Sequence, residues 1–433
     1  MVSACRLLVC CVKSGSTREF NRRLLYMTYR QIISGMALFL VGASTPCLSG
    51  PQQNSEKTIF QATPERFRFM PGTVLNVDGK DHLITVVAEF GKLVGDWSPN
   101  KLVLVASHDG GKNWETDKIS VFQEPVRGPN ITSPSFLRLS DQEVLFFFNS
   151  NGMWYKRSTD NTKTWGNPVR LPYFGDPVYG GSDMAAEHPV LLKSGRIVLP
   201  YYYLQGDQCA NGKYSGYVSP LYSDDNGRTW KRANSITVRA RDWWLGGLGD
   251  RSSNPNMCFV AEEPAVVELK DGRLFMLIRT YAGWYYKSYS KDQGATWSEP
   301  ANSGIPAPGA IPTLRRIPST GDLLLIYNHG EPEEINGAWP RHTLAAMISR
   351  DEGKTFSSMR VLVGGKDFPG KITMPAVTFL GNDAVIFYGK SPSKLNSYDW
   401  VRQIVPIPWF YEGDETKVYG EGNLDAKVQD VKK

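Results

Sequence analysis

The chain has 433 residues, of which 41% are hydrophobic and 12% aromatic, so it can bury a large core and does not have the composition of a disordered protein. Its formal net charge is +6, but residues 1–50 carry six basic side chains and one acidic one, and so hold +5 of it. The remaining charge of about +1 leaves no basic surface for nucleic acid, which excludes that class of partner.

Residues 1–49 form a leader. Arg30 precedes an apolar run at residues 32–41 and small residues at 42–44, which is the pattern of a secretory signal within residues 27–49. We therefore expect a secreted or periplasmic protein, and we interpret Met27 as the true start, with residues 1–26 as a misassigned extension. The apolar run is too short to span a bilayer, so no stable membrane span is expected after signal removal. An uncleaved anchor is the alternative.

Cysteine and histidine usage indicates no metal site. Only Cys209 and Cys258 lie beyond the leader, and both a disulfide and two unpaired thiols fit them. The five His residues are scattered. We expect no metal and no organic cofactor.

After a linker at residues 50–63, six two-residue turns separate apolar, β-branched or aromatic runs. Turn dipeptides of this kind between such runs predict β-hairpins. The turns are Asp78-Gly79, Ser140-Asp141, Ser194-Gly195, Asp271-Gly272, Thr320-Gly321 and Gly381-Asn382.

Five of the hairpins are followed by an octet of the form S-x-D-x-G-x-T-W. The octets begin at Ser107, Ser158, Ser223, Ser290 and Ser349. Their Asp can accept hydrogen bonds from the amides of a tight turn, their Gly can adopt positive φ, and their Trp can pack beneath the turn. Thr162 replaces the Gly in the second octet, and Phe356 replaces the Trp in the fifth.

The six hairpins recur at a spacing long enough for one small sheet each. This predicts an all-β fold, a six-bladed β-propeller of antiparallel four-stranded sheets over residues 64–411. A strand near residues 58–62 is expected to complete the last blade, which ends in a strand at residues 401–411. The polar tail at residues 412–433 is expected to fray. A pair of β-sandwiches is the alternative.

The octet resembles the Asp box, or bacterial neuraminidase repeat, of the sialidase (neuraminidase) superfamily. The resemblance implies that the boxes are structural and lie on the outer rim. It also implies an exo-acting glycoside hydrolase that removes a terminal acidic sugar, sialic acid by default, from a glycan or glycoconjugate. That chemistry needs three arginines for the substrate carboxylate, a Tyr nucleophile paired with a Glu, and an Asp acid/base.

The best match to this set is Glu263 with Arg279, at the two ends of one predicted hairpin. The resemblance makes Glu263 the acidic partner of the nucleophile, with Glu262 as the fallback, and makes Arg279 a carboxylate clamp. A salt bridge at the rim of the propeller is the alternative interpretation of the pair.

Asp96 follows Glu89 by seven residues, as the resemblance expects of the acid/base; a solvated loop Asp is the alternative. Arg341, just before a predicted strand, is expected to be a second clamp. Arg68 is the candidate for the remaining arginine, although Phe69 stands where the motif has its Arg. A shift of one residue turns a strand side chain to the opposite face unless a bulge restores it.

No Tyr stands where the resemblance expects the nucleophile, because the chain reads Gly370-Lys371-Ile372 there. Tyr388 and Tyr398 are the nearest candidates. A second acidic group at the start of the third blade comprises Asp183, Glu187 and His188. This group can perform acid/base work on a sugar, or simply cap the strand that begins at Pro189.

Two long segments, residues 204–219 and 239–258, are expected to form loops at the rim of one face. Two other functions fit the same pattern. One is a propeller enzyme that acts on a different glycan, because fold does not fix function. The other is a non-catalytic glycan-binding propeller that stacks sugars on Trp243, Trp244, Trp284 and Tyr285. Trp284 is a substrate-binding candidate in each case. The sequence indicates no oligomeric state.

Overall fold

The computed structural model describes residues 55–92, 95, 98–172, 182–183, 188–209, 213–238, 261–280, 282–331, 340–392 and 397–420. They belong to one unit of the chain, residues 53–433. For residues 182–183, 205–209 and 213–215 only the backbone is described. The predictions for the leader and for Asp96, Glu187, Trp243, Trp244 and Cys258 lie outside the described residues.

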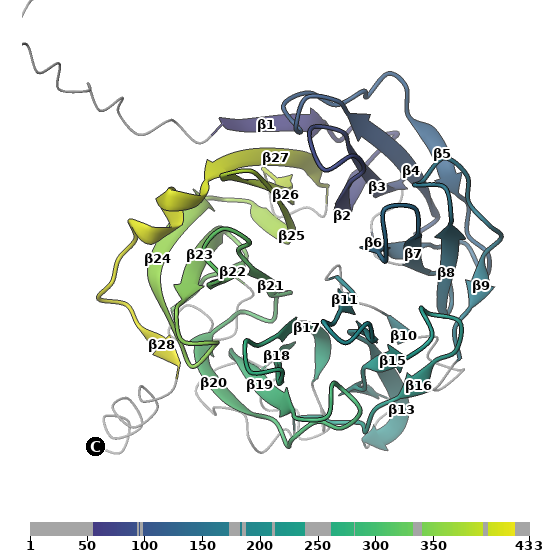
Figure 1. Ribbon diagram of the computed structural model, residues 1–433. Coiled ribbons are helices and arrows are strands. Elements are labelled where there is room, and N and C mark those ends of the chain that lie inside the picture. Colours follow the sequence, from purple (N-terminus) through teal and green to yellow (C-terminus); the bar gives the residue numbers. More distant parts are fainter. Residues whose placement is uncertain are drawn as a thin grey trace, which may run out of the picture. The chain divides into compact units, whose positions relative to one another are not determined.

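Six blades of antiparallel strands radiate around a central axis, so the predicted β-propeller is confirmed (Figure 1). Three blades have four strands in plain chain order, with the first strand nearest the axis. They are β2 (Arg68–Asn76), β3 (Leu83–Phe90), β4 (Asn100–Ser107) and β5 (Ser120–Gln123); β6 (Thr132–Arg138), β7 (Val144–Asn149), β8 (Met153–Ser158) and β9 (Val169–Arg170); and β17 (Glu262–Glu268), β18 (Leu274–Arg279), β19 (Trp284–Ser290) and β20 (Ala301–Pro306).

The third blade is less regular, because two sheets share it. One sheet contains β11 (Val190–Leu191), β12 (Ile197–Leu199), β15 (Leu221–Ser223) and β16 (Lys231–Arg232), and the other contains β10 (Ser182–Asp183), β13 (Tyr202–Cys209) and β14 (Lys213–Val218). The prediction of a loop at residues 204–219 is therefore wrong, since β13 and β14 pair there as a hairpin. The Gly- and Asp-rich composition suggested a loop with solvated backbone groups. In the structure those groups are hydrogen-bonded between the two strands instead.

The fifth blade has five strands: β21 (Thr313–Arg316), β22 (Leu323–Asn328), β23 (Thr343–Ser349), β24 (Thr355–Gly364) and, from the C-terminal segment, β28 (Tyr419–Gly420). The expectation that the whole tail frays is wrong for residues 413–420. β28 pairs with β24, and Asp414 forms an antiparallel bridge with Met359. The first half of the outer edge of β24 is thereby paired at these positions.

The ring closes in the sixth blade, where β25 (Lys371–Leu380), β26 (Asp383–Ser391) and β27 (Asp399–Pro406) are joined by β1 (Ser55–Phe60) from the other end of the unit. The closing strand is thus confirmed, and it lies inside the range first assigned to a linker. Glu56 fastens it by accepting hydrogen bonds from Tyr388 Oη at 2.7 Å and Lys390 Nζ at 2.6 Å.

The expected last strand at residues 401–411 is shorter than predicted, because β27 ends at Pro406. A 3₁₀-helix, η2 (Ile407–Tyr411), follows it. Pro406 and Pro408 have no backbone N–H to donate, so a ladder cannot continue through them.

The core lies between neighbouring blades rather than at the axis. The second strand of a blade is covered on both faces, and β7, β18 and β22 are accordingly buried at every position. These strands therefore have continuous apolar runs instead of an alternating pattern. The aromatic ring of each octet fills a gap between blades; Trp114 packs edge-on against Phe387, with ring centroids 5.4 Å apart.

The octets have the geometry that their sequence predicts. In the third copy, Asp225 Oδ1 accepts hydrogen bonds from the Thr229 amide and from Ser223 Oγ, both at 2.8 Å. Gly227 has φ +76°, and its carbonyl accepts a bond from Trp230 Nε1 at 3.2 Å. Phe356 lacks that N–H but is 1% exposed, so its packing role is kept.

Thr162 adopts φ +73° at the position that Gly occupies in the other octets. A β-branched residue in this region is strained, so we expect Thr162→Gly to raise the free energy of unfolding by about 1 kcal/mol. Gly353→Ala is the opposing control, because its Cβ would lie 2.8 Å from Phe275 Cε1. Denaturant unfolding measures both, and a less stable Thr162→Gly variant would contradict the strain.

The octet carboxylates should make the fold acid-sensitive. Hydrogen bonds from the side chain and amide of Thr164 lower the pKa of Asp160 to about 2, and similar bonds lower the pKa of Asp225. Because the folded pKa lies below the unfolded value of 3.8, this stabilisation is present above about pH 4 and is lost as pH falls toward 2.

Unfolding midpoints measured between pH 6 and 2 should therefore fall steeply below pH 4. Asp160→Asn should lower the number of protons linked to acid unfolding by about one. An unchanged acid dependence in that variant would show that the carboxylate contributes nothing.

Candidate active site on the axial face

Every blade of a propeller follows the same course, so the first strands all begin on one face of the ring. Arg68 begins β2, Glu262 begins β17 and Lys371 begins β25. Arg279 ends β18, the strand that pairs with β17, and is the Cα partner of Glu262. We call this side the axial face; three of these four residues were predicted as site residues, and Lys371 was not.

Glu262, Glu263 and Arg279 form a buried ionic cluster. Arg279 Nη1 forms an ion pair with Glu263 and lies 3.9 Å from Glu262 Oε2. Two consecutive strand residues normally point to opposite faces. Here the register shifts between Glu262 and Ala265, and Glu263 has φ +42°. This bulge turns both carboxylates toward one guanidinium.

The same bulge recurs on other first strands, and a proline marks it. Register shifts follow Thr132 in β6 and Thr373 in β25, where Ser133 has φ +55° and Met374 has φ +54°. As with Glu263, each of these two residues precedes a Pro, which has no N–H for the ladder. The repeated X-Pro pair is the sequence signal that could have located the bulges in advance.

Of the two glutamates, Glu263 is the better placed for chemistry. Glu262 is 6% exposed and packs against the third blade, where a Cβ added to Gly216 would lie 3.0 Å from Glu262 Cγ. The side chain of Glu263 is more exposed than that of Glu262. The fallback candidate therefore has a mainly structural position.

Arg68 faces the site although it is one residue away from the motif position. Phe69 points into the core and is fully buried, and the alternation of the strand sends Arg68 to the other side. There its guanidinium lies 5.2 Å from the ring centroids of both Phe90 and Tyr398. The bulge in β2 lies further along the strand, between Pro71 and Val74. Arg68 therefore faces the site through ordinary strand alternation and not through a bulge.

Arg341 lies between the exit of the fourth blade and the start of the sixth. Its Nη2 donates to the Gly309 carbonyl at 2.7 Å, and its Nη1 donates to Thr373 Oγ1 at 3.4 Å. Its own carbonyl accepts a 2.6 Å bond from the amide of Ile372. These bonds hold the Arg341 guanidinium against the first residues of β25.

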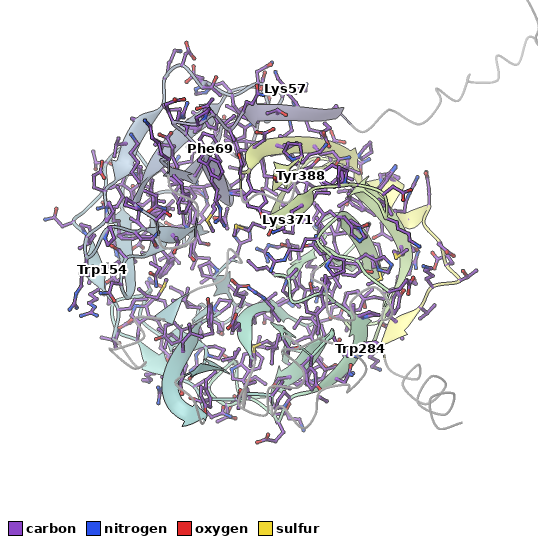
Figure 2. The ribbon with its side chains drawn as sticks, turned by 180° about the vertical axis from the view of Figure 1, so that it is seen from behind. Lys57, Phe69, Trp154, Trp284, Lys371 and Tyr388 are labelled. Carbon is purple, nitrogen blue, oxygen red and sulfur yellow. The ribbon has the colours of Figure 1, made fainter. Side chains whose placement is uncertain are left out.

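Lys371 lies near enough to Arg341 and Arg68 to be affected by their charges, and the sequence analysis gave it no role. Burial lowers the pKa of Lys371, and the charges of Arg341 and Arg68 lower it further. Figure 2 shows Lys371 at the inner edge of the ring, beside the axis. The available signal was its place in the sequence, since it stands where the resemblance expects a tyrosine.

Neither tyrosine candidate occupies the place of a nucleophile. Tyr388 is fully buried and donates to Glu56 on the closing strand, and burial together with the Glu56 charge raises its pKa. Tyr398 is 4% exposed and its ring supports Arg68. Among the described residues, Glu263 bonds to Arg279 and to no tyrosine hydroxyl.

The second acidic group is only partly described. Asp183 lies in β10 as the Cα partner of Tyr202, and its side chain is outside the described atoms. The His188 ring donates to the carbonyl of Val377 in β25. Burial and the nearby Arg315 charge lower the His188 pKa well below its usual value, so the imidazole is neutral at pH 7. His188 therefore links the third blade to β25, the first strand of the sixth.

The aromatic candidates lie away from this group. Trp284 begins the third strand of its blade and packs against the core between the third and fourth blades. Figure 2 shows it far from Lys371. Tyr285 is fully buried, with its ring centroid 6.4 Å from that of Tyr327. The proposal that Tyr285 stacks on a sugar is wrong, because alternation along the strand turns it into the core.

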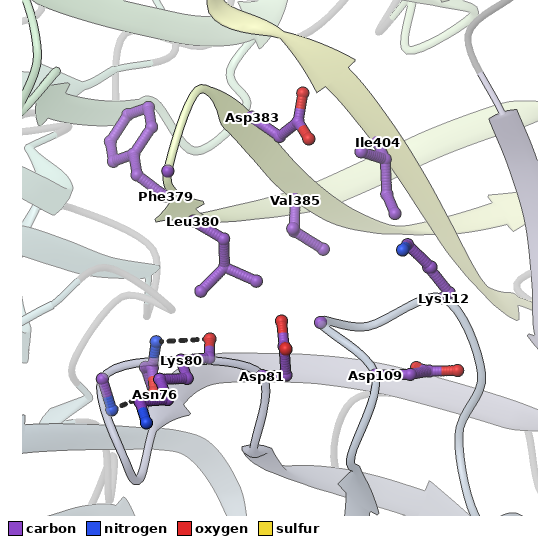
Figure 3. Close-up of a pocket in the computed structure, with 13 residues that line it drawn as sticks. Asn76, Lys80, Asp81, Asp109, Lys112, Phe379, Leu380, Asp383, Val385 and Ile404 are labelled. Atoms are coloured by element: carbon purple, nitrogen blue, oxygen red, sulfur yellow. Dashed lines mark hydrogen bonds between the residues drawn. The ribbon is translucent and has the colours of Figure 1, made fainter.

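A pocket on the opposite face is shown in Figure 3. It is lined by Asn76 and Leu380, which end the strands that Arg68 and Lys371 begin, and by octet residues such as Asp109. It lies at the hairpin turns of the first and sixth blades. The octets are thus on the face away from the cationic group.

Comparison with known proteins identifies the family. The family model described as "BNR repeat-like domain" matches residues 135–386. The chain belongs to this family. The resemblance to the sialidase superfamily is thereby confirmed, and it extends over the second to sixth blades.

Two curated relatives are both sialidases. The protein is 28% identical to a sialidase of Paraclostridium sordellii over 219 residues, which cover 44% of this chain and 48% of that one. It is 27% identical to a sialidase of Clostridium perfringens over 243 residues, which cover 50% of this chain and 54% of that one. The match thus spans about half the length of these relatives.

Solved structures share the fold at low identity. A Dyadobacter fermentans protein of unknown function aligns with TM-score 0.60 and 18% identity, over 81% of this chain and 99% of that one. Trypanosoma rangeli sialidase in complex with sialic acid aligns with TM-score 0.58 and 15% identity, over 88% of this chain and 61% of that one. These likenesses establish the propeller and not its chemistry.

Within the described ranges, no helix has the length and apolar character to cross a bilayer. The same ranges contain no group of three or more His, Cys, Asp or Glu residues placed to hold a metal ion.

The ionic cluster gives a stability test. Arg279→Met would leave Glu262 and Glu263 side by side and buried without their cation, so we expect the free energy of unfolding to fall by about 3 kcal/mol. Glu262→Gln in the same background should recover part of the loss by removing one charge. Denaturant titration of both variants measures this, and an unaffected Arg279→Met variant would show that the cluster is not a stabilising unit.

Proposed function

We propose that the protein is a sialidase-type exo-glycosidase that removes a terminal acidic sugar from a glycan, with sialic acid as the first candidate. The observation that carries the proposal is the pairing of Glu263 with Arg279 on the face where Arg68 and Arg341 also lie. The family and the two sialidase relatives support it.

In this proposal Arg68 and Arg341 bind the sugar carboxylate. A guanidinium presents parallel N–H donors that match the two oxygens of a carboxylate, which fixes its orientation as well as its charge. Arg68 is pre-positioned between aromatic rings and Arg341 by two hydrogen bonds, so little side-chain freedom is lost on binding.

Glu263 would accept the proton of the nucleophile that attacks the anomeric carbon of the sugar. Arg279 holds the Glu263 carboxylate in place. Asp96 would protonate the leaving oxygen from its loop, and it remains a prediction from sequence. The bulge at Glu263 is the device that brings a strand carboxylate to this position, and its unfavourable φ is stabilised by the ion pair.

The direct test is release of free sialic acid from a simple aryl sialoside by the full chain. Glu263→Gln should lower the rate roughly 10²–10⁴-fold, because the side chain keeps its shape and loses its basicity. Glu299→Gln, at an exposed position, is the matched control and should leave the rate unchanged. Full activity in Glu263→Gln would exclude the assigned role.

A propeller enzyme for a different glycan is the second candidate, and Lys371 at the expected place of the tyrosine favours it. Turnover of another acidic glycoside, with none of the sialoside, would select it. Saturable glycan binding without turnover would instead indicate a binding propeller.

We also propose that the protein is exported, on the basis of the signal pattern at residues 27–49. N-terminal sequencing of the protein made by its native host should then begin beyond residue 41. A mature chain that starts at Met1 or Met27 would contradict export by cleavage.

A further inference from the structure

Asn328 is a buried side chain that joins two blades at the axial face. It ends β22 in the fifth blade, as Arg279 ends β18 in the fourth, and it is fully buried. Its Nδ2 donates to the Thr343 carbonyl at 3.2 Å within its own blade and to the Ile372 carbonyl at 2.9 Å in β25. Both N–H donors are therefore used, and one of them crosses to the first strand of the sixth blade.

Ile372 connects Asn328 with Arg341. The Ile372 carbonyl accepts the bond from Asn328, and the Ile372 amide donates to the Arg341 carbonyl at 2.6 Å. The next residue, Thr373, accepts a 3.4 Å bond from Arg341 Nη1 through its hydroxyl oxygen. Asn328 thus anchors the short segment of β25 that contacts both the backbone and the guanidinium of Arg341.

The oxygen of the Asn328 side chain shows that this position is not simply filled by packing. In the part of the chain that the structure describes, Asn328 Oδ1 is buried and has no hydrogen-bond partner. A buried acceptor without a partner is unfavourable, and an apolar side chain of similar size would avoid it. An asparagine here is explained if its bonds from Nδ2 have a role beyond filling space.

We propose that Asn328 is a positioning residue for the carboxylate site: through Ile372 it holds Arg341 in the geometry that binds the carboxylate of an acidic sugar. The role of Arg341 in this inference rests on the proposed function. A guanidinium makes two parallel bonds to a carboxylate only when it is oriented toward both oxygens, so a small shift of its support weakens binding. Because the carboxylate takes no part in the bond that breaks, the loss should appear in substrate binding more than in kcat.

Binding of a sugar acid and of its methyl ester separates positioning from folding. Calorimetry with free sialic acid and with its methyl ester should show that the wild-type chain prefers the acid, because only the acid offers a carboxylate. Asn328→Leu should reduce this preference roughly tenfold, as expected for the loss of one charge-assisted contact, and should weaken binding of the ester much less. A residue needed only for stability would affect both ligands equally. In turnover of an aryl sialoside, Asn328→Leu should raise KM about tenfold and change kcat less.

Thr313→Val is the matched control. Thr313 begins β21 in the fifth blade, is fully buried, and donates to the Pro375 carbonyl of β25 at 2.6 Å. The variant therefore also removes a buried bond between the fifth and sixth blades, but the acceptor lies in the bulge that follows Thr373. It should lower the free energy of unfolding in denaturant and leave the preference for the acid unchanged.

The inference is overturned if Asn328→Leu folds and keeps the preference, if Thr313→Val loses it to the same extent, or if the wild type has no preference. Should Asn328→Leu fail to fold, Asn328→Ser, which keeps one donor, should show an intermediate preference, and an unchanged preference would overturn the inference as well. A failed proposed function looks different: no sialic acid would be released from the aryl sialoside, while the preference in binding and its dependence on Asn328 would persist.

Discussion

Closure of the ring by β1 is the interaction on which the site depends. β1 pairs with β27 in the last blade, and the chain then passes directly into β2, which begins at Arg68. Arg68 forms a parallel bridge with Tyr398, and the Phe69 amide donates to the Tyr398 carbonyl at 3.0 Å. The first and last blades are thus joined at Arg68 and Tyr398. The strand that holds the fold together also assembles the cationic group.

The bulges on the first strands show how a repeated architecture acquires distinct chemistry. The same two-for-one step occurs in β6, β17 and β25 and leaves a non-glycine residue at positive φ in each. In one blade that residue is Ser133 and in another it is Met374, and only in the fourth is it a glutamate. The strain is therefore a property of the fold, and Glu263 puts it to use by meeting Arg279.

The two faces of the propeller divide the work. On one face, the octets hold tight turns by hydrogen bonds that keep their carboxylates charged. On the axial face, Arg68, Arg341 and Lys371 gather, and their charges oppose one another. The first arrangement is satisfied internally and stabilises the fold. The second lies where we propose that a sugar carboxylate binds, so one face is assigned to stability and the other to ligand binding.

The sequence by itself determined what lies within one hairpin or one turn. The six turns and the octets are local, because each is set by a few consecutive residues. The meeting of Glu263 with Arg279 depends in addition on a bulge, since the Cα partner of Arg279 is Glu262. These predictions agree with the structure. The closing strand was also predictable, since a sheet that lacks one strand needs a partner.

The tertiary structure alone decided which side chains from different blades meet. Lys371, Arg341 and Arg68 are far apart in sequence, and their meeting depends on ring closure and on which face each side chain takes. Tyrosine is a residue type expected at such a site, but Tyr388 is hydrogen-bonded to Glu56 and Tyr285 is buried in the core. On a strand, one residue of register decides between core and solvent, and local pattern does not fix that register where a bulge intervenes.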